Sequence, residues 1–428
     1  MRFFLLIGVA GLCLPAGGHA AEREQLPQPL TLNQALSWAG QYNPTLRGAR
    51  IELRRSEGVL EHADVAVPSN PQLQLGTAER EGPSGATSTD IDIRLSQTFW
   101  IAGQGGLRED AAKSRLSGAQ SRLDFLGSAT FARVRAAFLQ ALVAERAVAT
   151  AEDVLQVNRD LENYAKRRLE AGKATRLEAN TARIGLGRSQ ALLAQAENRQ
   201  AQARLQLAEL LAVDPAKSIS LQGRLNPAPL ELPSQAQLLQ RAIARRGDLA
   251  AAAREVSASQ EELKLAHRQI VPNLTVFGFY GEEETNEITG GGVSFELPLL
   301  HRFGGERKQA QAELDAARLE RDVLQLTVRS QVLSAVADYE AARQRVAALS
   351  DEVVDAARQN FELTQRAFEA GELGAPALTA AQDTLINTRR DYLDALEALV
   401  NAGTDLERAT GGLVVMSNTS AANSGPRK

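Results

Sequence analysis

Two long stretches without proline constrain the fold of this chain more than any other feature. They run from Gln104 to Glu170 and from Gly304 to Ala370. Because proline breaks a helix interior, each stretch can form one uninterrupted helix. At about 1.5 Å rise per residue, such a helix would be roughly 100 Å long. Helices of this length do not fit within one globular core, so the sequence predicts an elongated, mainly helical molecule.

Small and apolar residues within these stretches recur in alternating steps of three and four, the period of a coiled coil. Many of them are alanines, which let neighbouring helices approach closely. We therefore expect long antiparallel coiled-coil helices. The positions are Val134, Ala137, Ala141, Ala144, Val148, Ala151 and Leu155 in the first stretch, and Val332, Ala335, Tyr339, Ala342, Val346, Leu349, Val353, Ala356, Asn360, Leu363 and Ala367 in the second.

The chain also contains an internal duplication. The motif Arg-x-x-Glu-Ala-Gly closes the first stretch at Gly172 and recurs at Gly371, 199 residues later (371 − 172). Glycine at the end of a helix can adopt the left-handed backbone that stops it, so each motif predicts a turn into a returning helix. Three earlier matches occur in the same order at a similar spacing: residues 43–46 with 246–249, residues 67–73 with 271–274, and Phe138 with Tyr339. Each half is expected to contain a helix of about 30 residues, two strands, a very long helix, the motif and another long helix.

These patterns divide the chain into a signal peptide (1–20), a first repeat (21–213), a proline-rich connector (214–235), a second repeat (236–412) and a disordered polar tail (413–428). Residues 1–20 have one arginine, a short apolar run and a small-x-small end, as a cleaved secretory signal does. Cys13, the only cysteine, follows Leu12 rather than the small residue of bacterial lipoproteins, which disfavours the alternative of lipidation. No later segment is apolar for long enough to form a membrane-spanning helix.

The predicted strands alternate between apolar and polar residues. In residues 89–99, Asp90, Asp92 and Arg94 lie on the face opposite to the isoleucines and leucine, and Glu296 has the same place in residues 292–299. Their partners are residues 72–77 and 273–281, with loops at 78–89 and 282–292. Such strands are typical of an outer-membrane barrel, where these four charged residues would line the lumen. A small sheet packed on helices in water is the alternative, with the same residues simply solvated.

Four strands are too few to close a membrane barrel. Single-chain barrels begin at eight strands, and an open sheet edge in lipid would leave backbone groups unpaired. Several copies of the chain must therefore share their strands. Aromatic residues gather at the strand segments and favour a belt at the membrane interface, with packing between the strands and the helix tops as the alternative. They are Phe99, Trp100, Phe277, Phe279, Tyr280 and Phe295.

Charge and motif content exclude several other classes of function. The net charge of −4 comes from 48 basic and 52 acidic residues that are interspersed, so nucleic acid is not an expected partner. Beyond the leader, the histidines His62, His267 and His301 are far apart in sequence, which predicts neither a metal site nor a cofactor. No nucleophile motif or phosphate-binding loop stands out, so we do not expect an enzyme. The alternative of an exported hydrolase would require a nucleophile or a metal cluster.

Three sequence segments, in this order and together with the duplicated motif, resemble the outer-membrane efflux (TolC-like) family. They are LTLNQALSWAGQYNPTLRGAR at 30–50, LSQTFWIAGQGG at 95–106 and FELPLLHRFGGER at 295–307. The resemblance runs from about Leu32 to Gly412. It implies a homotrimer in which twelve strands form one outer-membrane barrel and twelve helices form a tunnel across the periplasm. It also implies that the helix turns dock a periplasmic adaptor protein, which links the tunnel to an inner-membrane RND-type pump.

Carried over to this chain, the resemblance places adaptor docking at the two turns. The matching residues are Arg167, Gly172, Lys173 and Thr175 in the first turn, and Arg366, Gly371, Glu372 and Pro376 in the second. The family narrows its aperture with a ring of acids, but the matching positions here are Ala377 and Ala380. Glu178 is the candidate aperture acid in the first repeat, and a solvated helix-face carboxylate is the alternative.

Only one short sequence segment indicates the cargo. FWIAGQGGLRED, residues 99–110, resembles the cobalt-zinc-cadmium (CzcC-like) branch, which implies export of divalent heavy-metal cations. A duct for drugs or other small molecules is the alternative within the same family. A soluble periplasmic coiled-coil adaptor is the alternative outside it.

Overall fold

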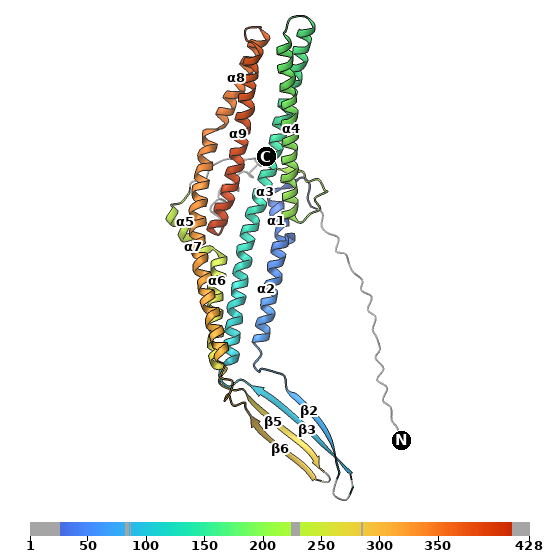
Figure 1. Cartoon of the computed structure of the whole chain (residues 1–428), viewed down its shortest axis with the longest axis vertical. Helices are drawn as coiled ribbons and strands as arrows, with labels where there is room; N and C mark the ends of the chain where they lie inside the picture. The colour runs from blue at the N-terminus through green and yellow to red at the C-terminus, as the bar shows by residue number, and fades with distance from the viewer. Residues whose placement is uncertain (1–25, 82–84, 86, 224–231, 284–285, 413–428) are drawn as a thin grey trace, which may run out of the picture.

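The computed structural model describes residues 26–81, 85, 87–223, 232–283 and 286–412. The predicted signal peptide and polar tail lie outside these residues, as do residues 224–231 of the predicted connector. The described chain is a long bundle of helices with a four-stranded sheet at one end and two helix turns at the other (Figure 1). The predicted elongated, mainly helical fold is therefore confirmed.

A similar succession of elements occurs twice. The first contains β1 (Leu30–Thr31), α1 (Leu32–Tyr42), α2 (Pro44–Ala63), β2 (Gln72–Glu81), β3 (Thr87–Phe99), α3 (Gln104–Glu170) and α4 (Arg176–Leu211). After β4 (Leu221–Gln222), the second contains α5 (Gln235–Arg245), α6 (Gly247–Arg268), β5 (Leu274–Glu283), β6 (Asn286–Ser294), α7 (Gly304–Ala348), α8 (Asp351–Glu369) and α9 (Ala375–Thr410). The short strand β4 pairs in parallel with β1.

The predicted opening helix of about 30 residues is wrong in both repeats, because a buried polar residue breaks it. Asn43 caps α2 by accepting from the Thr45 amide at 2.9 Å, and its side-chain amide donates to the Leu210 carbonyl at 2.7 Å. Arg246 lies at the break between α5 and α6 and is also buried, but it forms no side-chain cap; its guanidinium donates to Asp248 and to Gln331. Each break fixes a short helix, α1 or α5, to the longer helices of its own repeat.

The first long helix matches its prediction, whereas the second does not. α3 is continuous over 67 residues, and its predicted seam is buried except for the half-buried Val148. The second stretch divides into α7 and α8 at Leu349 and Ser350. Ser350 has extended backbone, with φ −50° and ψ 163°. The sequence Ser-Asp-Glu favours a new helix start, since acids in a first turn interact well with the helix dipole.

This break moves the buried seam of α8. The five predicted seam residues of α7 up to Val346 are buried. In α8, the predicted seam residues Val353, Ala356, Asn360 and Leu363 are exposed, and Ala357, Phe361 and Phe368 are buried in their place. Tyr392 of α9 lies at the break and donates a hydrogen bond to Asp351. Burial and this hydrogen bond raise the pKa of Tyr392 to about 12.

The sheet is antiparallel, with strand order β2-β3-β5-β6. Helices α2, α3, α6 and α7 pack side by side in the same order. The sheet is longer than predicted: β2 reaches Glu81, and β6 occupies the glycine-rich segment that was predicted as a loop. The glycines belong in the strand because Phe279 and Phe277 cover Gly290 and Gly292, where a Cβ atom would meet their rings at 2.5 and 2.9 Å.

Candidate functional site

The two Arg-x-x-Glu-Ala-Gly motifs form the same turn. Gly172 and Gly371 have φ +70° and +80°, the left-handed backbone expected of them. The next amide in each turn donates back to the helix, from Lys173 to the Arg168 carbonyl at 2.8 Å and from Glu372 to the Ala367 carbonyl at 2.9 Å. These contacts are a Schellman motif, which satisfies carbonyl groups that the helix end leaves free. Both turns lie at the end of the molecule remote from the sheet (Figure 1).

The predicted docking residues are brought together on this end and are exposed. The side chains of Arg167, Lys173, Thr175, Arg366, Glu372 and Pro376 all lie at the surface of the protomer. Arg168, which was not among the docking residues predicted from the sequence, also contributes to the first turn. Its guanidinium donates to the Lys173 carbonyl at 2.9 Å and lies over the Tyr164 ring. The only sequence signal was an arginine four residues after a tyrosine on a helix.

The helices that leave the two turns begin differently. Thr175 and Glu178 form a capping box: the Thr175 hydroxyl accepts from the Glu178 amide at 3.2 Å, and the Glu178 carboxylate accepts from the Thr175 amide at 3.3 Å. α9 begins at Ala375 after Gly374, which provides no side-chain cap, and Pro376 lies in its first turn. Glu178 therefore caps the start of α4. Its role as an aperture acid stays a prediction.

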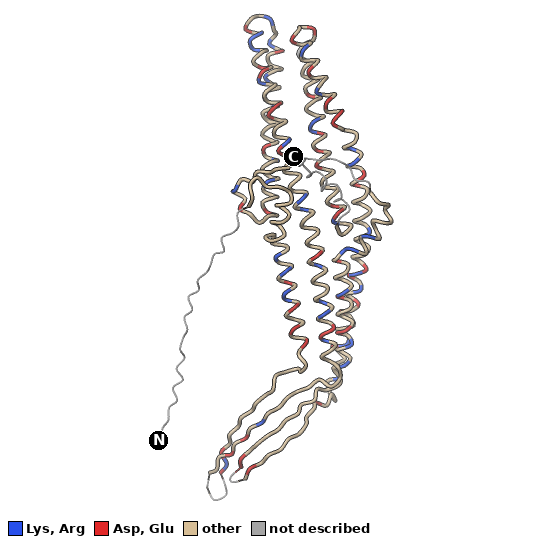
Figure 2. The backbone as a smooth tube through the Cα atoms, turned by 180° about the vertical axis from the view of Figure 1, so that it is seen from behind, with Lys and Arg blue, Asp and Glu red and all other residues tan. Residues whose placement is uncertain are grey.

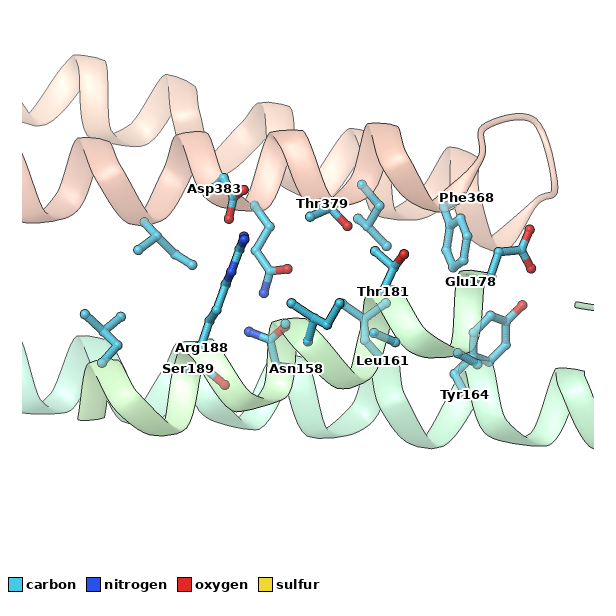
Figure 3. Close-up of a pocket in the computed structure, with 18 of the residues that line it drawn as sticks. Asn158, Leu161, Tyr164, Glu178, Thr181, Arg188, Ser189, Phe368, Thr379 and Asp383 are labelled. Carbon is cyan, nitrogen blue, oxygen red and sulfur yellow. The ribbon is translucent and has the colours of Figure 1, made fainter. Parts of the chain in front are cut away.

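A cleft of about 460 Å³ lies behind the turns, between the α3–α4 and α8–α9 hairpins (Figure 3). At its end nearest the turns, Tyr164 and Phe368 are in an edge-to-face contact at 5.9 Å, and Arg168 and Glu178 line the cleft beside them. Further from the turns, Arg188 and Asp383 point toward one another from opposite hairpins. Among the described residues, no group of three or more His, Cys, Asp and Glu side chains is arranged to hold a metal ion.

The predicted lumen residues divide into two groups. Asp90, Asp92 and Arg94 share one face of β3, as predicted, and Asp90 forms an ion pair with Arg80 at 2.8 Å. Glu296 lies beyond β6, which ends at Ser294, so its predicted place on a strand face is wrong. The strand ends early because its pairing with β5 stops at Thr275.

The aromatic residues of the sheet do not form one belt. Phe277 and Phe279 lie on the same face as Arg94, whose guanidinium is 5.0 and 5.9 Å from their ring centres. Tyr280 pairs with Ile93 on the opposite face. Two of the six predicted belt residues therefore face the polar side, because the rings fill the space above the glycines of β6.

Comparison with known proteins agrees with this architecture. The family described as "Outer membrane efflux protein" matches residues 35–213 and 238–412. The cobalt-zinc-cadmium resistance protein CzcC of Cupriavidus metallidurans is 27% identical over 96% of this chain and 99% of its own length. The pyoverdine export outer membrane protein OpmQ of Pseudomonas putida is 26% identical over 86% of this chain and 76% of its own.

A solved structure shows the same fold. The Campylobacter jejuni CmeC outer membrane channel superposes with a TM-score of 0.79 at 14% identity, over 89% of this chain and 85% of the other. Among the described residues, no helix is long and apolar enough to cross a membrane. The family match covers most of both repeats, together with the helical hairpins and the sheet described above. The chain is therefore a member of the outer membrane efflux protein family, whose members are passive channels rather than enzymes.

Proposed function

We propose that three copies of this chain form an outer-membrane duct that passively conducts export cargo from the periplasm to the exterior. The observation that carries this proposal is the exposed apolar face of the sheet. Leu73, Leu75 and Val293 are 63%, 71% and 60% exposed in the protomer. An apolar face this exposed marks a surface that is covered in the working state. We infer that lipid covers this face, because apolar and polar residues alternate along the strands as they do in membrane barrels.

The distribution of charge supports the same placement. Figure 2 shows acidic and basic residues along the helices, whereas the sheet carries few charges until its far end. A band with few charges between two charged zones suits the hydrocarbon layer of a membrane, where charged groups are costly. The helices would then project into the periplasm. Export through a signal peptide cleaved near Ala20 is part of this proposal.

The free edges of the sheet support assembly from several copies. Within the described residues, β2 and β6 each pair on one side only. In lipid these edges require partners, because no water is available to satisfy their backbone groups. Pairing β6 of one copy with β2 of the next satisfies both edges, and three copies give a closed barrel of twelve strands. The same contact places α7 of one copy beside α2 of the next.

Cysteine crosslinking tests this assembly. Leu73→Cys in β2 is combined in turn with Thr289→Cys, Gly291→Cys and Val293→Cys in β6, all on one face of the sheet. Cys13 lies in the predicted leader, so no other cysteine competes in the cleaved chain. We expect one pair to give a ladder that ends at a trimer. Crosslinks absent from all three pairs, with the protein folded and in the membrane, would contradict the β6-to-β2 contact.

The two exposed turns are proposed to dock a periplasmic adaptor protein, which connects the duct to an inner-membrane RND pump. Their support is position: both turns lie at the tip of the helices, and their side chains are exposed. Exchanging residues 173–178 with residues 372–378 tests whether the turns divide this task. We expect weaker adaptor crosslinking from the exchanged chain, while its own trimer stays intact. Unchanged crosslinking would show that the two turns are equivalent.

Divalent heavy-metal cations are the proposed cargo. The support is the likeness to CzcC, a cobalt-zinc-cadmium resistance protein, over nearly the whole chain. The second candidate is a small organic cargo, favoured by the likeness to OpmQ, a pyoverdine export protein. Deleting the gene and comparing growth on cobalt, zinc and cadmium with growth on drugs and dyes separates the two. Lost drug tolerance with unchanged metal tolerance would overturn the metal proposal.

A further inference from the structure

The cleft between the two hairpins has the size of a small-molecule site. Its volume of about 460 Å³ lies within the range of roughly 300 to 1,000 Å³ that such sites occupy. Residues of α3, α4, α8 and α9 line it, so a bound molecule would contact both hairpins at once (Figure 3). Ala174 of the first turn also lines it, as do Arg168 and Phe368 from the two duplicated motifs, whereas the sheet does not.

The end of the cleft nearest the turns suits a planar apolar group. Tyr164 of α3 and Phe368 of α8 meet there edge to face, and Leu161 and Leu378 lie beside them. Phe368 and Leu378 belong to one buried cluster, against which Tyr164 and Leu161 pack. Aromatic rings bind flat apolar groups through offset or edge contacts.

The other end of the cleft has an unmet hydrogen-bond donor. Gln382 of α9 is 6% exposed, and within the described part of the chain its buried side-chain nitrogen has no hydrogen-bond partner. The neighbouring buried polar groups are satisfied: the Asn158 amide donates to the Val154 carbonyl, and the Ser189 hydroxyl donates to the Leu186 carbonyl. A buried donor without a partner calls for an acceptor oxygen from another molecule.

Positive charge dominates this same end. Arg188 of α4 and Arg390 of α9 line it, and of the described residues only Asp391 lies within ion-pair distance of either, at 3.9 Å from Arg390. Among the described residues that line the cleft, Asp383 is the carboxylate at this end, since Glu178 lies nearer the turns and is bound in its own capping box; Asp391 does not line the cleft. Two guanidinium groups and a buried amide thus face one carboxylate, which favours an anionic ligand group.

We propose that this cleft binds a small organic anion. Its planar apolar body lies against Tyr164 and Phe368, and its carboxylate or sulfonate accepts hydrogen bonds from Arg188, Arg390 and Gln382. Because these groups come from both hairpins, the ligand holds the two hairpins together. Binding itself does not depend on the proposed duct, so the two can fail separately.

Calorimetric titration of the purified full chain in a non-ionic detergent tests the proposal, with a matched detergent blank. The probes are 2-naphthalenesulfonate and its neutral counterpart 2-naphthalenesulfonamide, which share one ring system. We expect the sulfonate to bind at least about tenfold more tightly, since charge-assisted hydrogen bonds are worth that factor or more. Equal affinities for the two probes would overturn the proposal.

Variants then locate the site. The double variant Arg188→Gln and Arg390→Gln should weaken sulfonate binding about tenfold and leave sulfonamide binding unchanged. Asp383→Asn removes a like charge and should tighten sulfonate binding about threefold. Arg183→Gln is the matched control, because Arg183 is exposed on α4 and does not line the cleft. Sulfonate affinity that is unchanged in the double variant, or lowered as much in the control, would place binding elsewhere and contradict the proposal.

Discussion

The two hairpins end in the same turn but are supported differently. α3 runs without interruption to Glu170, whereas α7 ends at Ala348 and α8 begins at Asp351. α4 begins with the capping box of Thr175 and Glu178, whereas α9 begins at Ala375, and Gly374 before it provides no side-chain cap. The duplicated motif therefore fixes the turn alone. The continuity of the helix before the turn and the capping of the helix after it are set separately in each repeat.

The largest expected difference between the hairpins concerns helix continuity. Glu152→Pro in α3 should lower the free energy of unfolding by about 3 kcal/mol or more, because it removes a helical hydrogen bond and clashes with the preceding turn. Asp351→Pro, at the same spacing before the second motif, should cost about 1 kcal/mol, chiefly from the lost Tyr392 hydrogen bond. The first position of a helix tolerates proline, and Ser350 already has the extended backbone that proline prefers before it.

Thermal unfolding followed by circular dichroism measures both proline variants. Glu152 is exposed on α3, so its replacement tests the backbone rather than packing. Equal losses of stability would mean that α7 and α8 behave as one continuous helix and that the break has no mechanical consequence.

The turns themselves should respond alike. Gly172→Ala and Gly371→Ala should each cost about 1 kcal/mol, because a side chain disfavours the left-handed backbone. No other atom lies within 4 Å of a Cβ added at either glycine, so backbone strain is the sole cause. Asparagine at the same positions should cost less, since it adopts this backbone more readily. A large loss at one glycine with none at the other would contradict the equivalence of the turns.

Capping should give the smallest difference. Thr175→Ala removes the side-chain acceptor of the first hairpin and should cost about 1 kcal/mol. Gly374→Ser offers the second hairpin the cap that it lacks and should gain a few tenths of a kcal/mol. The Gly374 backbone, with φ −86° and ψ 161°, already suits a serine cap. Loss of stability in both variants would show that the second turn is held in a shape that a cap disturbs.

Local patterns predicted much of this fold. The absence of proline and the three-four spacing predicted α3 and its buried seam, and the left-handed glycines followed from the motif alone. Alternation predicted the two faces of β3. These features depend on backbone chemistry and side-chain periodicity, both of which can be read along a single chain.

Features that depend on contacts between distant segments were missed. The break at Ser350 has no proline or glycine beside it in the sequence, and Tyr392 contacts Asp351 from another helix. The glycine-rich sequence of β6 was predicted as a loop, because its place in a strand depends on the rings of Phe277 and Phe279, which cover these glycines from β5. The cleft requires the two hairpins to be set side by side, so Gln382, Arg188 and Arg390 gave no signal as a group.

Fractionation of cells that express the full chain tests the outer-membrane placement and the trimer together. We expect the protein in the outer-membrane fraction, migrating as a trimer on a denaturing gel until the sample is heated. This follows from the exposed apolar face and the two unpaired edges of its sheet. Recovery of a folded protein in the soluble periplasmic fraction would contradict the account and favour a soluble coiled-coil adaptor.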